Sequence, residues 1–173
     1  MRRYRSTSTV LFSLLAISIT ISSCEQNRDE ELTELVNDTY AEIIDLYDEK
    51  VDGSLSTDLV DLVNESRAVT DQSIKEIEAS DHPTDRPASI EGPIFCSLYE
   101  GYDTHKIKQI DSSDDGAKVL VEFHNNIYDE TWTDTVLFVN DGGWKLDNVL
   151  YFREFSTYAD LKSSLTSFVV NNQ

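Results

Sequence analysis

The chain has 173 residues, of which 39% are hydrophobic, and a formal net charge of −19 at pH 7. This length and composition suit one globular domain with a substantial core. So acidic a surface repels the phosphates of nucleic acids and anionic lipid headgroups alike, which argues against nucleic-acid binding and against passive adsorption to a membrane.

The N-terminal segment has the three parts of a secretory signal. It opens with three arginines and contains no acidic residue before Glu25. A mostly apolar run of 12 residues follows from Val10 to Ile21, and small residues then lead into Cys24. A helix that spans a bilayer needs about 20 residues, so this run is too short for a permanent transmembrane helix. The sequence therefore predicts a signal peptide at residues 1–23.

The cysteine after this signal resembles the bacterial lipobox, in which the thiol is acylated and becomes the new N-terminus. A consensus lipobox has leucine three residues before the cysteine and alanine or glycine directly before it, where this chain has Ile21 and Ser23. The resemblance implies that Cys24 carries fatty acids such as palmitate and that residues 24–28 form a short tether. An ordinary secretory signal with an incidental cysteine is the alternative.

Cleavage before Cys24 would remove three arginines and no acidic residue, which changes the formal charge from −19 to −22. Because such a surface does not adsorb to anionic lipid, covalent acyl chains are the expected way to hold the protein at a membrane. Glu25 and the acidic residues just after it favour the outer membrane, on its periplasmic face or at the cell surface.

The first half of the predicted domain, residues 29–170, has helical periodicity. Over residues 29–50, apolar residues recur on one face and acidic residues on the other, which predicts an amphipathic helix. Ser56 is the expected N-cap of a second helix, in which the pattern is interrupted over residues 64–72. Three prolines then predict a loop over residues 80–93.

The second half switches to the alternation of β-strands. Four strand-like runs are separated by segments short enough for antiparallel hairpins: residues 105–110, 118–124, 132–140 and 144–152. The third run is apolar on both faces, which predicts a sheet covered by helices on one face and partly hidden on the other. A final helix is expected over residues 157–170, with Thr157 and Asp160 as its capping box. The predicted class is α+β, with N-terminal helices packed on a curved four-stranded antiparallel meander and a C-terminal helix.

This order of elements is similar to the nuclear transport factor 2-like (cystatin-like) fold. More narrowly, three motifs resemble the bacterial domain-of-unknown-function 3828 family. They are a Leu-Ser pair that opens the second helix, an Asp-Pro-Phe segment before the sheet, and a Gly-x-Trp closing strand. This chain has Leu55-Ser56, Gly92-Pro93-Ile94-Phe95 in place of the second motif, and Gly142 to Val149. The resemblance implies this fold and an envelope setting, and it implies no catalytic residues.

The segment from Asp111 to Gly116, followed by Glu122, has the oxygen-ligand spacing of a calcium-binding loop. Calcium loops of this type lie between helices, whereas both flanks here alternate like strands. Lys118 would also place a cation beside the bound ion. A hairpin turn explains the same residues and is the preferred interpretation.

The chain has three histidines, His82, His105 and His124. A hairpin that turns near Asp114 would bring His105 and His124 close together on adjacent strands, beside Glu122. A zinc site or an acid–base pair would use such a cluster. Two histidines that occur in a sheet by chance are the alternative.

Cys96 is flanked by apolar residues, so a small buried hydrophobe is expected there rather than a nucleophile. Four aromatic residues of the predicted strands either line a cavity in the concave sheet or belong to its core: Trp132, Trp144, Tyr151 and Phe152.

The favoured function is that of a non-enzymatic envelope lipoprotein, anchored through Cys24, whose domain binds a small ligand or another protein. No catalytic residue, metal site or cofactor is expected. Two alternatives stay open. One is an enzyme with its chemistry in the sheet cavity, and the other is an immunity-type protein that binds a basic partner.

Overall fold

The computed structural model describes residues 26–173, apart from the side chain of Val51. It confirms the predicted α+β class, with two N-terminal helices, a four-stranded antiparallel meander and a C-terminal helix. The predicted signal peptide and Cys24 lie outside the described residues. Within residues 26–173, no helix is long and apolar enough to cross a membrane.

The sheet has the strand order β1-β2-β3-β4, and each strand is antiparallel to the next. The strands are β1 (Thr104–Ser112), β2 (Gly116–Asn125), β3 (Glu130–Asn140) and β4 (Trp144–Leu150). Each strand contains most of the residues that the alternating pattern predicted for it. Successive side chains of a strand point to opposite faces, so a sheet with one buried face produces this alternation.

Alternate residues of β2 and β3 form a buried face, here called the inner face of the sheet. The largest of them are buried to within a few per cent: Val119, Val121, Phe123, Trp132 and Val136. The residues between them form the outer face, where Leu120, Leu137 and Val139 are only partly buried. This difference confirms that one face is covered and the other partly hidden.

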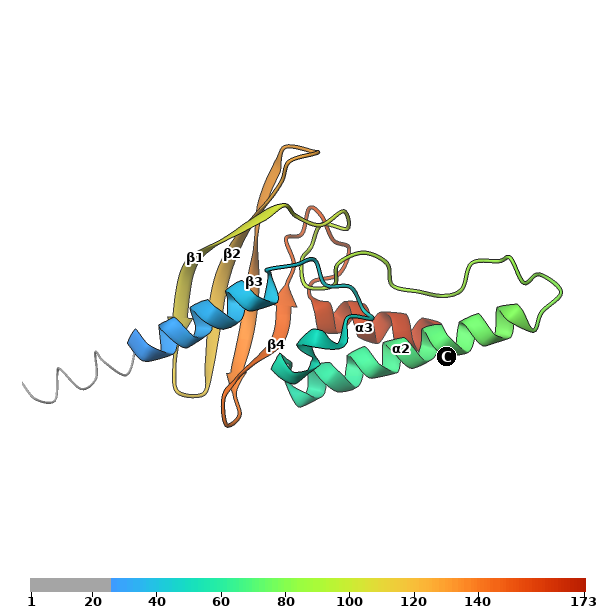
Figure 1. The fold of residues 1–173 in the computed structure, drawn as a ribbon, viewed down its shortest axis with the longest axis horizontal. Coiled ribbons are helices and arrows are strands. Elements are labelled where there is room, and N and C mark those ends of the chain that lie inside the picture. Colours follow the sequence, from blue (N-terminus) through green and yellow to red (C-terminus); the bar gives the residue numbers. More distant parts are fainter. Residues whose placement is uncertain (1–25) are drawn as a thin grey trace, which may run out of the picture.

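The first helix spans residues 26–39 and lies across the sheet, in front of it in Figure 1. Leu32 and Val36 of this helix have no exposed surface and belong to the same core as the inner face. Its first three residues, 26–28, fall in the segment that the sequence analysis assigned to a tether. The helix also ends eleven residues before the predicted end at residue 50.

The segment after this helix corrects the prediction of one long helix. Residues 41–48 are turns and extended chain, followed by the 3-10 helix η1 (Glu49–Ser54). In this path Ile44 and Leu46 are buried while Ile43 and Tyr47 are about half exposed. A continuous helix would have placed Ile43, Ile44 and Tyr47 on one face, so core packing has overridden the local periodicity.

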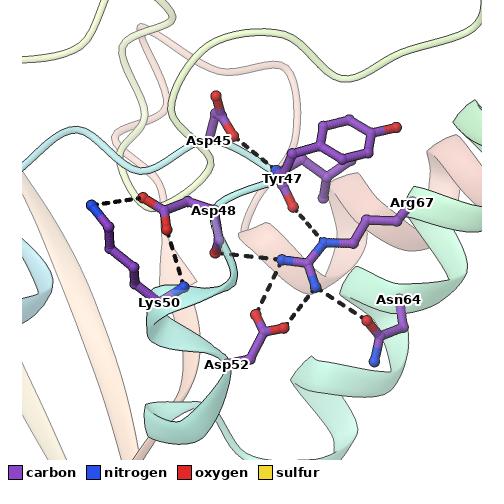
Figure 2. A network of polar contacts seen from close by, with 8 residues as sticks. Asp45, Tyr47, Asp48, Lys50, Asp52, Asn64 and Arg67 are labelled. Carbon is purple, nitrogen blue, oxygen red and sulfur yellow. Dashed lines mark hydrogen bonds and ion pairs between the residues drawn. The ribbon is translucent and has the colours of Figure 1, made fainter.

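Arg67 of α2 (Thr57–Glu78) holds this segment in place. Its Nε donates to the carbonyl of Leu46 at 2.7 Å, and its two terminal nitrogens bind the carboxylate of Asp52 at 2.7 and 3.1 Å. Figure 2 shows the guanidinium between α2 and η1, with Asn64 as a further acceptor. Bidentate contacts between arginine and a carboxylate fix the orientation of the two groups as well as the distance between them.

Helix α2 begins at Ser56 as predicted, since the Ser56 hydroxyl accepts from the amide of Leu59 at 3.3 Å. The interrupted pattern over residues 64–72 left a break possible there, but α2 is continuous. Ser66 and Thr70 are buried there, and each donates its hydroxyl to the carbonyl four residues earlier. These internal bonds satisfy the polar groups, so small polar residues occupy the buried side of a continuous helix.

Helix α3 (Leu161–Asn171) lies beside α2, and both lie next to β4 (Figure 1). It begins later than predicted, because Asp160 itself is the N-cap and accepts from the amide of Ser163 at 2.9 Å. Asp160 also forms a bridge with Leu150, and the amide of Ser56 donates to the carbonyl of Leu146 at 2.8 Å. The edge of β4 is therefore covered by the starts of α2 and α3.

Candidate functional site

The structure separates the two histidines that the sequence analysis placed together. His105 pairs with Phe123 in the β1–β2 register, so it lies on the inner face, while His124 lies on the outer face. The His105 ring is 5.7 Å from that of Tyr40, and His124 Nδ1 is 2.9 Å from the hydroxyl of Thr131. His124 follows Phe123 in β2, and successive residues of a strand point to opposite faces of the sheet. The two histidine side chains therefore lie on opposite faces and cannot share a metal or a proton.

The described residues contain no second candidate metal site. No group of three or more His, Cys, Asp or Glu side chains within residues 26–173 is arranged to hold a metal ion. His82 lies exposed just after α2.

The predicted alternative to a calcium loop, a hairpin turn, is confirmed. The amide of Ser113 donates to the carbonyl of Gly116 at 2.9 Å, which closes the β1–β2 turn. Glu122 lies well inside β2 on the outer face, where its carboxylate binds Lys108 at 3.0 Å. The chain therefore does not fold around a central ion.

Cys96 is a free thiol that is only 4% exposed, as expected for a small core residue. Burial is the main cause that raises the pKa of this thiol far above its ordinary range. A neutral, buried thiol is a poor nucleophile.

The aromatic residues proposed for a cavity form part of the core. Trp132 is 3% exposed, stacks on Phe123 with 5.5 Å between ring centroids and meets Phe155 edge-on at 5.4 Å. The hydroxyl of Tyr151 donates to the carbonyl of Ile94 at 2.7 Å. The other two residues of the set, Trp144 and Phe152, also pack against this core.

A buried carboxylate that the sequence did not predict is Asp134 of β3, which has no exposed surface. It accepts hydrogen bonds from the amide and hydroxyl of Ser97 at 2.8 and 2.7 Å, from the amide of Phe152 at 2.8 Å and from the indole of Trp132 at 3.2 Å. Burial raises the pKa of Asp134 above its ordinary value. Its inward position in an alternating strand was the only feature of the sequence that indicated its burial. Its hydrogen bonds connect two loops to the sheet, and we call this arrangement the clamp.

Large apolar side chains are exposed at the tip of the β2–β3 hairpin. Ile127 is 82% exposed and Tyr128 is 54% exposed. Exposed residues of this size on a loop, supported by a rigid scaffold, are typical of protein-binding surfaces. Nothing in the local sequence pattern distinguished these two residues from an ordinary turn.

The backbone of the tip is supported by side-chain hydrogen bonds. The Asn125 side chain accepts from the amides of Ile127 and Tyr128 at 3.0 and 3.1 Å and donates to the carbonyl of Gly101 at 2.9 Å. The carboxylate of Asp103 accepts from the amide of Asn126 at 2.6 Å. A partner that binds this tip therefore needs to order little further backbone.

Two further apolar side chains lie on neighbouring loops. Ile43 is 50% exposed and lies against Gly101, where an added Cβ would come within 2.9 Å of the Ile43 side chain. Tyr99 is 57% exposed and donates its hydroxyl to Glu91. We call the end of the molecule that carries Ile43, Tyr99, Ile127 and Tyr128 the loop end.

The first helix begins at the opposite end of the sheet. Asp29 accepts from the hydroxyl of Ser112, and Arg28 pairs with Asp114 in the β1–β2 turn. From that turn, the ten residues of β2 lead to the loop end, which at 3.3 Å per residue places the two ends about 30 Å apart. Figure 1 shows the helix start beside the β1–β2 turn and the β2–β3 hairpin pointing away from it.

Comparison of the chain with protein-family models, with curated proteins and with solved structures finds no match. The motifs behind the family resemblance nevertheless have structural roles in this fold. Ser56 caps α2, Ile94 and Phe95 are buried, and Gly142 has a φ of 69° in the turn before β4. The family assignment stays a prediction.

Proposed function

We propose that this chain is a lipid-anchored envelope protein whose folded domain binds another protein through the loop end. The observation that carries the proposal is the placement of exposed apolar side chains, on a tip whose amides Asn125 binds, about 30 Å from the start of the first helix. Interface hot spots are enriched in aromatic residues such as the two tyrosines of the loop end.

The predicted anchor implies an orientation of the domain relative to the membrane. Cys24 precedes the first described helix by two residues, so an extended connection reaches only about 7 Å. Acyl chains on Cys24 would therefore hold the end of the sheet that contains the β1–β2 turn close to the bilayer. The loop end would then face away from the membrane, where a soluble or neighbouring partner can reach it.

Binding is favoured over catalysis because two chemically active groups of the core, Asp134 and Cys96, are inaccessible. His105 of the inner face is partly exposed, and its ring lies 3.2 Å from the side-chain oxygen of Asn37. Asp134 has no exposed surface and has four protein donors around it, and Cys96 is a buried thiol. An enzyme would need a carboxylate or histidine that substrate can contact. The sheet-cavity alternative thus gains no support from the positions of Asp134 and Cys96.

Site-specific photo-crosslinking in the native membrane tests the proposal. A photoreactive side chain at position 128 of the full chain is expected to capture one discrete protein, and the same group at position 170, an exposed valine of α3, is not. The double variant I127S/Y128S should lose co-purification of that protein, while V170S should keep it. Equal capture from both positions, or none from position 128, contradicts the proposal.

A further inference from the structure

Acidic side chains lie beside the apolar residues of the hairpin tip and of the loop before β1. The two segments that form most of the loop end, residues 99–103 and 125–130, contain four carboxylates and no lysine or arginine. All four residues are exposed: Glu100, Asp103, Asp129 and Glu130. The loop end therefore combines exposed apolar residues with acidic neighbours, here called its rim.

Four lysines lie on a different surface, the outer face of the sheet. Closer to the loop end, Arg86 and Lys50 are paired with Glu91 and Glu42. The strand registers place Lys106 opposite Glu122, Lys118 opposite Leu137 and Lys145 opposite Val139. Lys108 also contacts Glu122. Because these lysines lie on the strands and not on the hairpin tip, they do not neutralise the rim of the loop end.

We infer that the partner of the loop end is a basic protein, with an apolar groove bordered by lysine or arginine. This inference rests on the proposed function. The partner's groove would cover Ile127 and Tyr128, while its cations would meet the carboxylates at the rim, the arrangement found in many protein interfaces. A chain with a net charge of −19 also attracts a basic protein over long range and raises its rate of association.

The charge of the rim disfavours an acidic partner. An acidic protein would bring like charges against Glu100, Asp129 and Glu130 at short distance, which opposes binding. A neutral apolar groove would leave three carboxylates partly dehydrated without a counter-ion, which is unfavourable as well.

Three rim charges can be removed without disturbing the tip. Glu100→Gln and Glu130→Gln keep the size of the side chains, and Asp129→Asn keeps a residue that tolerates the positive φ of 54° at that position. Asp103 is left unchanged because it holds the amide of Asn126. The matched control removes three exposed charges from α2 instead, as D61N, E65Q and D71N.

The experiment uses the full chain in its native membrane, with the photoreactive group at position 128. We expect the captured protein to carry a net positive charge, and its yield to fall as salt is raised. The rim triple variant E100Q/D129N/E130Q should lower the yield at low salt by about tenfold, and the α2 triple variant should leave it unchanged.

Capture of an acidic or neutral protein overturns the inference while the proposed function stands. The inference also fails if the rim variant leaves the yield and its salt dependence unchanged, for a partner whose co-purification I127S/Y128S abolishes. Absence of any adduct from position 128 contradicts the proposed function itself and overturns the inference with it.

Discussion

Asp134 occupies a position where the alternation of β3 would ordinarily place an apolar side chain. Two of its four donors are backbone amides, those of Ser97 and Phe152, which belong to loops on either side of the sheet in sequence. Buried amides need acceptors, and a single carboxylate supplies them for both loops. One inward acid therefore fixes the chain before β1 and after β4 to the centre of the sheet.

Replacement of Asp134 by asparagine should lower the free energy of unfolding by about 1–3 kcal/mol, since the amide group offers donors where acceptors are required. Urea unfolding followed by the fluorescence of Trp132 and Trp144 measures the change. The control is Asp141→Asn in the exposed β3–β4 turn, which should unfold like the unmodified protein. Equal midpoints for the two variants would refute the clamp.

The difference in unfolding free energy between the unmodified protein and D134N should change with pH in one direction. Burial raises the pKa of Asp134 in the folded protein above its ordinary value of 3.8, so the folded state binds the proton more readily than the unfolded state. The stability from this group is fully present below that value and is lost as the pH rises through the folded pKa. The difference in unfolding free energy between the unmodified protein and D134N should therefore narrow from acid to neutral pH; a difference that widens would contradict the burial of this charge.

Cys96 should be unreactive in the native protein, because burial both shields the thiol and raises its pKa. A thiol reagent added at neutral pH is expected to label position 96 only at the rate at which the domain opens, and at once in denaturant. Mass spectrometry of the labelled peptides measures both rates. Rapid labelling of the folded protein would show that Cys96 is accessible.

At the scale of the elements, sequence patterns predicted those features that depend on interactions between residues close in the chain. The four strands and the start of α2 at Ser56 follow from alternation and capping, which depend on residues close in sequence. The end of the first helix does not, because residues 41–48 are placed by burial of Leu46 and by Arg67, far along the chain. Equally, Ser66 made α2 look interrupted, although its hydroxyl bonds within the helix.

The candidate site was less predictable than the fold. The tip of the β2–β3 hairpin depends on the bond between Asn125 and Gly101, which are 24 residues apart. A hairpin turn was expected there, but the exposure of Ile127 depends on which neighbouring loops cover it. The same limit applies to the histidines, whose faces follow from a register that the sequence did not specify to within one residue.

The contacts of Arg67 predict a measurable difference between two ion pairs. Arg67→Lys would lose the second contact to Asp52 and the bond to the Leu46 carbonyl, so we expect a loss of about 1–2 kcal/mol in unfolding free energy. Lys50→Met removes an exposed pair with Glu42 and should not shift the urea midpoint measurably. Similar midpoints for R67K and the unmodified protein would show that Arg67 does not hold the segment.

For the whole molecule, the sheet separates two ends with different chemistry. One end has the start of the first helix and the β1–β2 turn, and the other has the loop end with its acidic rim. If Cys24 is acylated, the first end lies at the bilayer and the second is presented about 30 Å away. The strongly negative charge then keeps the domain off anionic lipid, so its attachment depends on the covalent anchor.

The measurement that tests this anchor most directly is mass spectrometry of the intact protein isolated from its native membrane. Acylation predicts a polypeptide that begins at Cys24, with a mass increased by two or three fatty acyl chains on that residue. A native polypeptide that begins at any other residue, or one that begins at Cys24 without fatty acid, would contradict lipid anchoring.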